Sequence, residues 1–536
     1  MQHTPVEPHK QQRTLISGFL RSLRTHPDRV ALELGDQLLT YAELWERAGR
    51  IANALNQCLN PDAQLVALFA SRSVAAYSGV LGILAAGRGY VPLNPKFPLE
   101  RTLTMLSASG CKAVVVGAEC EEALITLLPR ITEPLVWILP DSTEPTGKDS
   151  FAPHRVIRRK DMQGVAEPRD PDVDGSATAY LLFTSGSTGI PKGVPISQAN
   201  VASYLSYAGP RFAIRPDDRC SQNFDLTFDV SVHDLFVCWD AGAALCPFPE
   251  QYLVPASLIN EKELTVWFSV PSVVMFATKL GLLEPGAFPS LRLSLFAGEA
   301  LSARLAVAWQ QAAPRSVLEN IYGPTEATIT ITGYRWDPDR SPAECVRGIV
   351  PIGWIYEGQE CCVVNENLSP LPNGESGELC LAGSQVAAGY LNDPIRTRQQ
   401  FVQLPGSERT HWYRTGDLVK RDERGCIYYL GRIDHQVKIS GYRVELQEIE
   451  HVLREAADTE LAVAVPWPLS DGTASGIVAV IGGSDSSRDS RIIKLCQEKL
   501  PRYMVPSRIY HFADLPLNVS GKIDRPKIAL LVQSKE

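Results

Sequence analysis

A loop rich in glycine and hydroxylated residues follows an apolar segment in the first half of the chain. Residues 179–183 are apolar and predict a buried strand. The loop that follows contains Thr184, Ser185, Gly186, Ser187, Thr188 and Gly189, with Lys192 just beyond it. Glycine lets a backbone approach a ligand closely, and its N–H groups together with side-chain hydroxyls can bind phosphate oxygens. The pattern indicates a phosphate-binding loop, since a flexible linker seldom follows a buried strand directly.

The P-loop of many nucleotide-binding proteins is a different motif. It requires a glycine, a lysine and then serine or threonine at the start of a helix. Here Pro191 precedes Lys192, Gly193 follows it, and residues 194–196 continue as an extended segment. The sequence therefore predicts a triphosphate-binding loop of another design.

The loop resembles the phosphate-binding signature of the adenylate-forming superfamily. This superfamily includes acyl-CoA synthetases, luciferases and the adenylation domains of nonribosomal peptide synthetases. Its other motifs occur in the expected order from about Leu39 to Asp524, including residues 320–328, 413–417 and 515–524. The chain is most similar to stand-alone amino-acid-activating enzymes, among them prolyl-AMP ligases.

The composition excludes several classes of protein. The chain has 536 residues, 45% of them hydrophobic, which suggests roughly three to four structural modules. Its net charge of -8 and pI near 5.7 argue against a nucleic-acid ligand. No apolar run approaches the roughly 20 residues that span a membrane, and the polar N-terminus does not resemble a signal peptide. The 12 cysteines form no C-x-x-C pair, so we expect a cytoplasmic protein without structural zinc.

Strands alternate with helices through the first part of the chain. Residues 65–69 and 112–116 predict strands, and Thr40 with Glu43 forms a capping box for a helix through Leu55. This alternation predicts a parallel α/β sheet, and short β segments with glycine turns near residues 376–383 suggest a small barrel-like unit. The resemblance implies a large N-terminal domain of two stacked parallel α/β subdomains plus a small β-barrel, and a smaller mobile α+β C-terminal domain.

The expected division of the chain has three parts. Residues 1–14 are a loose tail, 15–431 the large adenylation core, and 432–536 a small lid with its hinge near Asp434. In the family the lid rotates after the first reaction step and presents a new face to a phosphopantetheine thiol. Gly441 would border the path of that thiol.

The resemblance implies adenylation with ATP and Mg²⁺. Joining a carboxylate to the α-phosphorus of ATP expels pyrophosphate and requires neutralised charge and in-line positioning. Lys522, Thr184 and Glu326 are the expected catalytic residues. Lys522 would bridge the substrate carboxylate and ATP, and Glu326 would hold Mg²⁺, which prefers oxygen ligands.

The other nucleotide contacts also follow from the family motifs. Tyr322 would stack on adenine, Gly298 would close over the other face of the ring, and Asp417 would bind the ribose hydroxyls. The complete set of expected ATP-binding residues is Thr184, Ser185, Gly186, Ser187, Thr188, Lys192, Gly298, Glu299, Asn320, Tyr322, Gly323, Thr325, Asp417, Arg432, Lys438 and Arg443.

Asp229 is the key residue of the expected acid pocket. In amino-acid-activating relatives an aspartate at this position pairs with the substrate ammonium, whereas a fatty-acid pocket would only bear its desolvation cost. Matching the family position by position gives Asp229, Val230, His233, Phe268, Leu295, Ala297, Ile321, Ile329, Thr330 and Lys522. These mostly apolar walls indicate a small neutral amino acid. We expect L-proline first, with alanine, 2-aminobutyrate and serine as alternatives, because His233 and Thr330 could bind a hydroxyl.

No carrier-domain serine or condensation motif was recognised in the sequence. We therefore expect the chain to load a separate phosphopantetheinylated carrier protein, with no nucleic-acid or membrane partner. An acyl- or aryl-CoA ligase is the alternative enzyme, and a non-catalytic binding module is a third. The presence of Thr184, Lys192, Glu326, Asp417 and Lys522 argues against the binding module.

Overall fold

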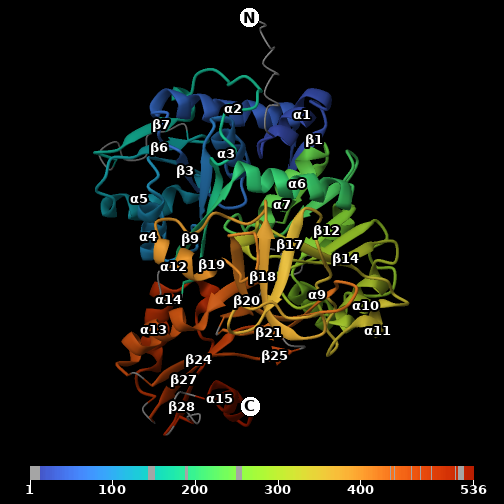
Figure 1. Cartoon of the computed structure of the whole chain (residues 1–536). Coiled ribbons are helices and arrows are strands. Elements are labelled where there is room, and N and C mark those ends of the chain that lie inside the picture. The colour runs from blue at the N-terminus through green and yellow to red at the C-terminus, as the bar shows by residue number, and fades with distance from the viewer. Residues whose placement is uncertain are drawn as a thin grey trace, which may run out of the picture.

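A large N-terminal part and a smaller C-terminal part make up the molecule (Figure 1). The computed structural model describes residues 13–142, 151–186, 191–248, 256–434, 436–439, 441–459, 461–470, 473–483, 486–513, 515–516 and 524–535. Within these residues the strands form five sheets, three in the large part and two in the small part.

The first sheet carries the expected phosphate loop. Its strand order is β7-β6-β5-β3-β4-β8-β9, and all neighbours are parallel except β8 and β9, which form a hairpin around the loop. The strands are β3 (Leu65–Phe69), β4 (Gly89–Leu93), β5 (Ala113–Val116), β6 (Val136–Leu139), β7 (Arg155–Arg158), β8 (Thr178–Thr184) and β9 (Lys192–Ser197). The associated helices are α3 (Val74–Ala85), α4 (Leu99–Ser109), η1 (Ala118–Cys120), α5 (Glu121–Leu127), η2 (Leu128–Arg130) and η3 (Arg159–Asp161).

The second sheet has the order β16-β15-β14-β13-β12-β10-β11-β1-β2. Its strands are β1 (Val30–Leu34), β2 (Gln37–Thr40), β10 (Arg219–Gln222), β11 (Ala244–Pro247), β12 (Val266–Ser269), β13 (Leu293–Phe296), β14 (Val317–Tyr322), β15 (Thr332–Arg335) and β16 (Trp354–Ile355). The helices are α1 (Ser17–Thr25), α2 (Tyr41–Cys58), α6 (Gln198–Phe212), α7 (Val230–Asp240), α8 (Ala256–Glu261), α9 (Pro271–Lys279), α10 (Ala303–Ala312), η4 (Thr325–Ala327) and α11 (Ser341–Glu344).

The two large sheets share one hydrophobic core. It joins buried side chains of both sheets with those of α2, α3, α6 and α7. The predicted capping box is present, because the Glu43 N–H donates to Thr40 Oγ1 at 3.2 Å and the Thr40 N–H donates to Glu43 Oε2 at 2.8 Å. The predicted start of α2 is therefore confirmed, although the helix continues to Cys58, beyond the expected Leu55.

Parallel pairing brings several functional loops to one edge of the second sheet. Strands β12, β13 and β14 run parallel, so the residues after Ser269, Phe296 and Tyr322 meet at their carboxyl ends. This is where open α/β sheets bind ligands. Helix α9 begins at Pro271, shortly after β12, because proline suits the first position of a helix.

The predicted barrel-like unit is an antiparallel sheet in the order β17-β18-β20-β19, with β21 paired to β20. Its strands are β17 (Gln359–Val364), β18 (Ser376–Gly383), β19 (Phe401–Val402), β20 (Trp412–Arg421) and β21 (Ile427–Arg432), with α12 (Pro394–Gln400) beside them. It is a half-barrel, and its long strand β20 carries Asp417 towards the second sheet.

The C-terminal part, red in Figure 1, contains two small sheets. One has β22 (Gln436–Ile439), β23 (Tyr442–Glu445), β25 (Leu469–Ser470) and β26 (Thr473–Ala474), and the other has β24 (Ala462–Pro466), β27 (Ile477–Gly482) and β28 (Ile509–Phe512). The helices are α13 (Leu446–Ala457), α14 (Asp489–Lys499), η5 (Arg502–Met504) and α15 (Arg525–Gln533). The predicted fold class, a large α/β domain with a smaller α+β domain, is thus confirmed.

Two further expectations concern the chain as a whole. No helix in the described ranges is long and apolar enough to cross a membrane. All 12 cysteines have free thiols. The adjacent Cys361 and Cys362 are half-buried on β17 and form no disulfide bond.

Candidate active site

A cavity of about 860 Å³ lies where the two parts of the molecule meet. Its walls come from the end of β8, the loops after β10, β12, β13 and β14, strand β20, and the β22–β23 hairpin of the C-terminal part. The expected site residues that line it are Thr184, Ser185, Asp229, Val230, Ala297, Gly298, Tyr322, Gly323, Thr325, Ile329, Asp417, Arg432, Lys438 and Arg443. Residues spread over 260 positions of sequence, from 184 to 443, therefore converge on one space.

A second cavity of about 320 Å³ shares Gly298, Tyr322, Arg432 and Lys438 with the first. Glu299 and Asn320, both expected ATP-binding residues, line this second space. The Lys438 ammonium lies 5.7 Å from the centre of the Tyr322 ring. The face and surroundings of that aromatic ring are therefore shared between the two spaces.

Glu326 is the centre of a buried charged cluster. Its Oε1 accepts hydrogen bonds from Lys192 Nζ at 3.2 Å and from the Tyr390 hydroxyl at 2.8 Å, and its Oε2 accepts one from Arg443 Nη1 at 3.2 Å. Burial alone would raise the pKa of Glu326, but the charges of Lys192 and Arg443 outweigh this and hold the pKa well below its ordinary value. The carboxylate is therefore ionised, and it is neutralised by two cations, Lys192 from β9 of the large part and Arg443 from β23 of the C-terminal part.

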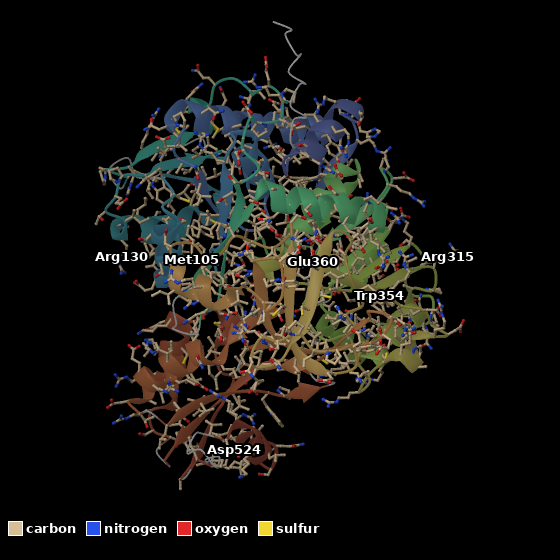
Figure 2. The ribbon with its side chains drawn as sticks, in the orientation of Figure 1. Met105, Arg130, Arg315, Trp354, Glu360 and Asp524 are labelled. Carbon is tan, nitrogen blue, oxygen red and sulfur yellow. The ribbon has the colours of Figure 1, made fainter. Side chains whose placement is uncertain are left out.

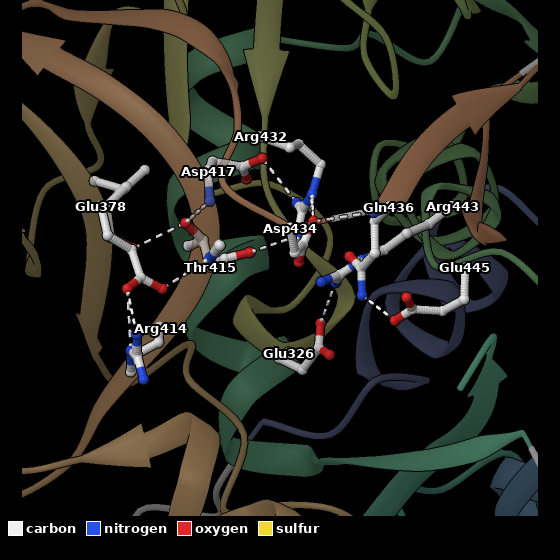
Figure 3. A network of polar contacts seen from close by, with 12 residues as sticks. Glu326, Glu378, Arg414, Thr415, Asp417, Arg432, Asp434, Gln436, Arg443 and Glu445 are labelled. Carbon is white, nitrogen blue, oxygen red and sulfur yellow. Dashed lines mark hydrogen bonds and ion pairs between the residues drawn. The ribbon is translucent and has the colours of Figure 1, made fainter. Parts of the chain in front are cut away.

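Arg432 connects Asp417 to the expected hinge residue (Figure 3). Its guanidinium donates to Asp417 Oδ1 at 2.8 Å and to both carboxylate oxygens of Asp434 at 2.7 and 2.6 Å. Asp417 Oδ2 accepts a hydrogen bond from the Tyr322 hydroxyl at 2.5 Å. The residues expected at the adenine, the ribose and the hinge thus form one hydrogen-bonded chain.

Asp229 lies at the start of α7 with only 8% of its surface exposed. Its Oδ2 has no hydrogen-bond partner among the described residues, although the side chain lines the cavity. Burial raises the pKa of Asp229 to about 7, and a hydrogen bond from the Thr325 side chain only partly opposes the rise. The N–H groups of Val230 and Ile329 also oppose the rise, so the carboxylate has hydrogen-bond donors but no cation beside it among the described residues, and its Oδ2 is left without a partner.

The remaining described residues of the expected acid pocket do not line the large cavity, although Ile321 lines the second one. Phe268, Leu295, Ile321, His233 and Thr330 are buried and do not line the large cavity. His233 Nδ1 and the Tyr204 hydroxyl are 2.6 Å apart, and burial lowers the pKa of His233 to about 3. The Thr330 and Tyr356 hydroxyls are 3.0 Å apart. Both polar groups considered as substrate ligands already have protein partners.

Ser187, Thr188 and Lys522 lie outside the described residues. Asp524, two positions after Lys522, is described: its N–H donates to the Pro516 carbonyl at 2.8 Å, and its side chain caps α15. Figure 2 shows Asp524 at the outer end of the C-terminal part. Gly186 of the phosphate loop is among the described residues, and it is buried.

Tyr390 is a site residue that the sequence did not suggest. The Tyr390 hydroxyl donates to Glu326. The centre of the Tyr390 ring also lies 4.9 Å from the Lys192 ammonium. Burial and the neighbouring Glu326 charge raise the pKa of Tyr390 well above its ordinary value, so the hydroxyl keeps its proton and remains a donor. It is 64 residues from Glu326 in a segment with no charged pattern, and nothing in the sequence marks the contact.

The fold and this cavity define an adenylate-forming enzyme, and the chain belongs to the AMP-binding enzyme family, whose model matches residues 19–391. It is 34% identical over 531 residues to the phosphinothricin tripeptide synthetase PhsC of Streptomyces viridochromogenes. That match covers 98% of this chain but 46% of the synthetase, so the chain spans less than half of this curated relative.

Two other relatives have nearly the same length as this chain. The D-alanine–D-alanyl carrier protein ligase of Bacillus licheniformis is 28% identical over 96% of this chain and 98% of its own length. The crystal structure of the Vibrio cholerae adenylation domain AlmE, in complex with glycyl-adenosine-5'-phosphate, matches with a TM-score of 0.88 and 33% identity over 100% of this chain and 99% of that chain. Both nonribosomal peptide synthetases and separate adenylation enzymes are therefore among its homologues.

Proposed function

We propose that this chain activates a small neutral amino acid with ATP as an aminoacyl-adenylate and releases pyrophosphate. It then transfers the aminoacyl group to the phosphopantetheine thiol of a separate carrier protein. The observation that carries this proposal is the buried, unpartnered Oδ2 of Asp229 at the cavity wall.

An ammonium group is the ligand that Asp229 lacks. A buried carboxylate without a partner is costly, and a cation at hydrogen-bond distance removes that cost. The α-ammonium of an amino acid would supply both the charge and the hydrogen bond. A carboxylic acid without an amine would not reduce the desolvation cost of the Asp229 carboxylate.

The residues around Glu326 fit a magnesium–triphosphate complex. Mg²⁺ commonly binds one or two carboxylates together with substrate phosphates, and the described residues hold no cluster of three or more metal-ligating side chains. Glu326 is the ionised carboxylate of this site, and Thr184 Oγ1 is buried without a partner in the described part of the chain. When bound, Mg²⁺ would neutralise charge on the phosphates, while Lys192 holds their oxygens.

The cavity walls favour a short, uncharged side chain. Val230, Ala297 and Ile329 present apolar surface beside Asp229. His233 is neutral at physiological pH and bonded to Tyr204, so it supplies no charge to a substrate. The glycyl-adenylate in the AlmE structure supports a small substrate. L-proline is the first candidate from the sequence, ahead of alanine, 2-aminobutyrate and serine.

The arrangement of the C-terminal part supports the second half-reaction. The N–H of Gly441 donates to Glu299 Oε1 at 2.7 Å, and Ser185 Oγ donates to the Arg443 carbonyl at 2.7 Å. The β22–β23 hairpin therefore covers the cavity.

An amino-acid-dependent ATP–pyrophosphate exchange panel tests the proposal. Each amino acid is paired with the matching acid that lacks the amine, for example alanine with propanoate. We expect exchange with small neutral amino acids and none with the amine-free partners. Exchange stimulated only by amine-free acids, followed by rapid thioester formation on coenzyme A, would identify an acyl- or aryl-CoA ligase instead.

A further inference from the structure

A buried ion pair joins the large part to the C-terminal part at the edge of the large cavity, which Arg101 helps to line. Arg101 on α4 donates from Nη1 to Glu448 Oε1 on α13 at 2.6 Å, across 347 positions of sequence. Their side chains are only 6% and 3% exposed. The two partners stand on opposite sides of the expected hinge at Asp434, so any rotation of the lid must separate them.

Aromatic rings from both parts lie in the same seam as this pair. The Arg101 guanidinium lies 5.6 Å from the centre of the Phe97 ring. On the lid side, the Tyr442 ring stacks on the Tyr503 ring, with their centres 3.6 Å apart. It also meets the Phe228 ring of the large part edge-on, with their centres 4.4 Å apart. These contacts close the same seam from both sides.

Two polar atoms of the pair lack hydrogen-bond partners within the described residues. Arg101 Nε and Glu448 Oε2 are buried without hydrogen-bond partners there. Burial raises the pKa of Glu448, and the Arg101 charge opposes that rise. Losing one partner would therefore leave the other charge buried alone, a state that the chain avoids by opening the seam and hydrating the charge. The pair thus affects the orientation of the lid more than the stability of either part.

We propose that Arg101 and Glu448 form an interdomain latch that stabilises the lid orientation seen here, and that this orientation serves thiol transfer and not adenylation. The assignment to thiol transfer rests on the proposed function. The latch is a positioning device. Glu448 also interacts with the Gly186 N–H of the phosphate loop, which lowers the pKa of the carboxyl, and rotation of the lid would break this contact together with the ion pair.

Matched variants separate the latch from a general effect on folding. E448Q and R101Q each remove one charge, and the double variant R101E/E448R restores an inverted pair. E100Q is the control, because Glu100 is adjacent to Arg101 on α4 but forms an exposed ion pair with Arg130. Thermal unfolding of every variant shows whether it is folded.

Three readouts test the latch: ATP–pyrophosphate exchange, single-turnover aminoacyl transfer to pantetheine, and the radius of gyration from small-angle X-ray scattering. We expect E448Q and R101Q to slow transfer by about 10-fold to 100-fold, within the usual range of coupling energies, and we expect E448Q to leave exchange within about 2-fold because Glu448 belongs to the lid. Both should enlarge the radius of gyration, and R101E/E448R should recover part of both effects while E100Q changes neither.

Equal losses in both half-reactions, or unchanged transfer and scattering in folded E448Q, would overturn the latch. Scattering also separates the two proposals. If the unmodified protein shows no exchange with any amino acid, the proposed function fails. An enlarged E448Q molecule would then still support the latch, and an unchanged one would refute it.

Discussion

Replacing Asp229 by asparagine should have opposite effects on stability and on catalysis. The pKa of Asp229 rises from 3.8 to about 7 on folding, which corresponds to a cost of about 4 kcal/mol when the group is ionised. Because the folded chain holds the proton more tightly, this cost is absent below about pH 4, grows as the pH rises, and is complete above about pH 7. Asp229→Asn removes an ionisable group while nearly preserving its shape.

Without substrate, the Asp229→Asn variant should therefore be more stable than the unmodified protein at pH 8 and about equally stable at pH 4. Catalysis should fall, because losing one partner of a buried charge pair costs about 3–5 kcal/mol. That corresponds to a decrease in kcat/KM for the amino acid of about 10²-fold to 5 × 10³-fold. Thermal unfolding at the two pH values and pyrophosphate exchange with varied amino acid measure both effects, and the KM for ATP serves as the control.

Two results would refute this reasoning about Asp229. A variant that is destabilised equally at pH 4 and pH 8 would show that Asp229 makes structural bonds that asparagine cannot replace. A variant with normal kcat/KM for the amino acid would show that the carboxylate does not bind the amine.

Three further substitutions test other residues of the site. Lys522→Ala should reduce exchange by about 10²–10³ while equilibrium dialysis shows nearly unchanged ATP binding, and unaltered exchange would remove Lys522 from the mechanism. Glu326→Gln should reduce exchange by roughly 100-fold or more and raise the Mg²⁺ concentration needed for half-maximal rate, whereas an unchanged Mg²⁺ dependence would mean that the metal binds elsewhere. Gly441→Ala should slow transfer to pantetheine about 10-fold but spare exchange. Residue 441 has a φ of +83°, which favours glycine, and an added Cβ would lie 2.5 Å from Val270 Cγ1. Normal transfer in this variant would show that the β22–β23 hairpin tolerates the side chain.

Local signals predicted much of the fold. The apolar runs at 65–69 and 179–183 became β3 and β8 within a residue of their expected ends, because buried parallel strands need continuous apolar sequence. The capping box at Thr40 specified the start of α2. The barrel-like expectation was less accurate, since short β segments alone do not reveal that the sheet stops at a half-barrel.

The site was predictable as a set of motifs but not as a network. Family resemblance marked Glu326. The strand that precedes it, β14, brings it to the expected edge of the second sheet. Tyr390 meets its acceptor Glu326 only through tertiary packing. The same holds for Arg101 and Glu448, which are also far apart in the sequence. The buried bond between His233 and Tyr204 likewise depends on how α6 and α7 pack, and it withdraws His233 from the polar substrate role considered from the sequence.

The most direct test of the account is a crystal structure with a non-hydrolysable aminoacyl-adenylate analogue. The analogue would carry the amino acid that gives the strongest pyrophosphate exchange. We predict that its ammonium lies within hydrogen-bond distance of Asp229 Oδ2 and that its adenine lies against Tyr322. An ammonium directed away from Asp229, with this carboxylate still unpartnered, would contradict the central claim.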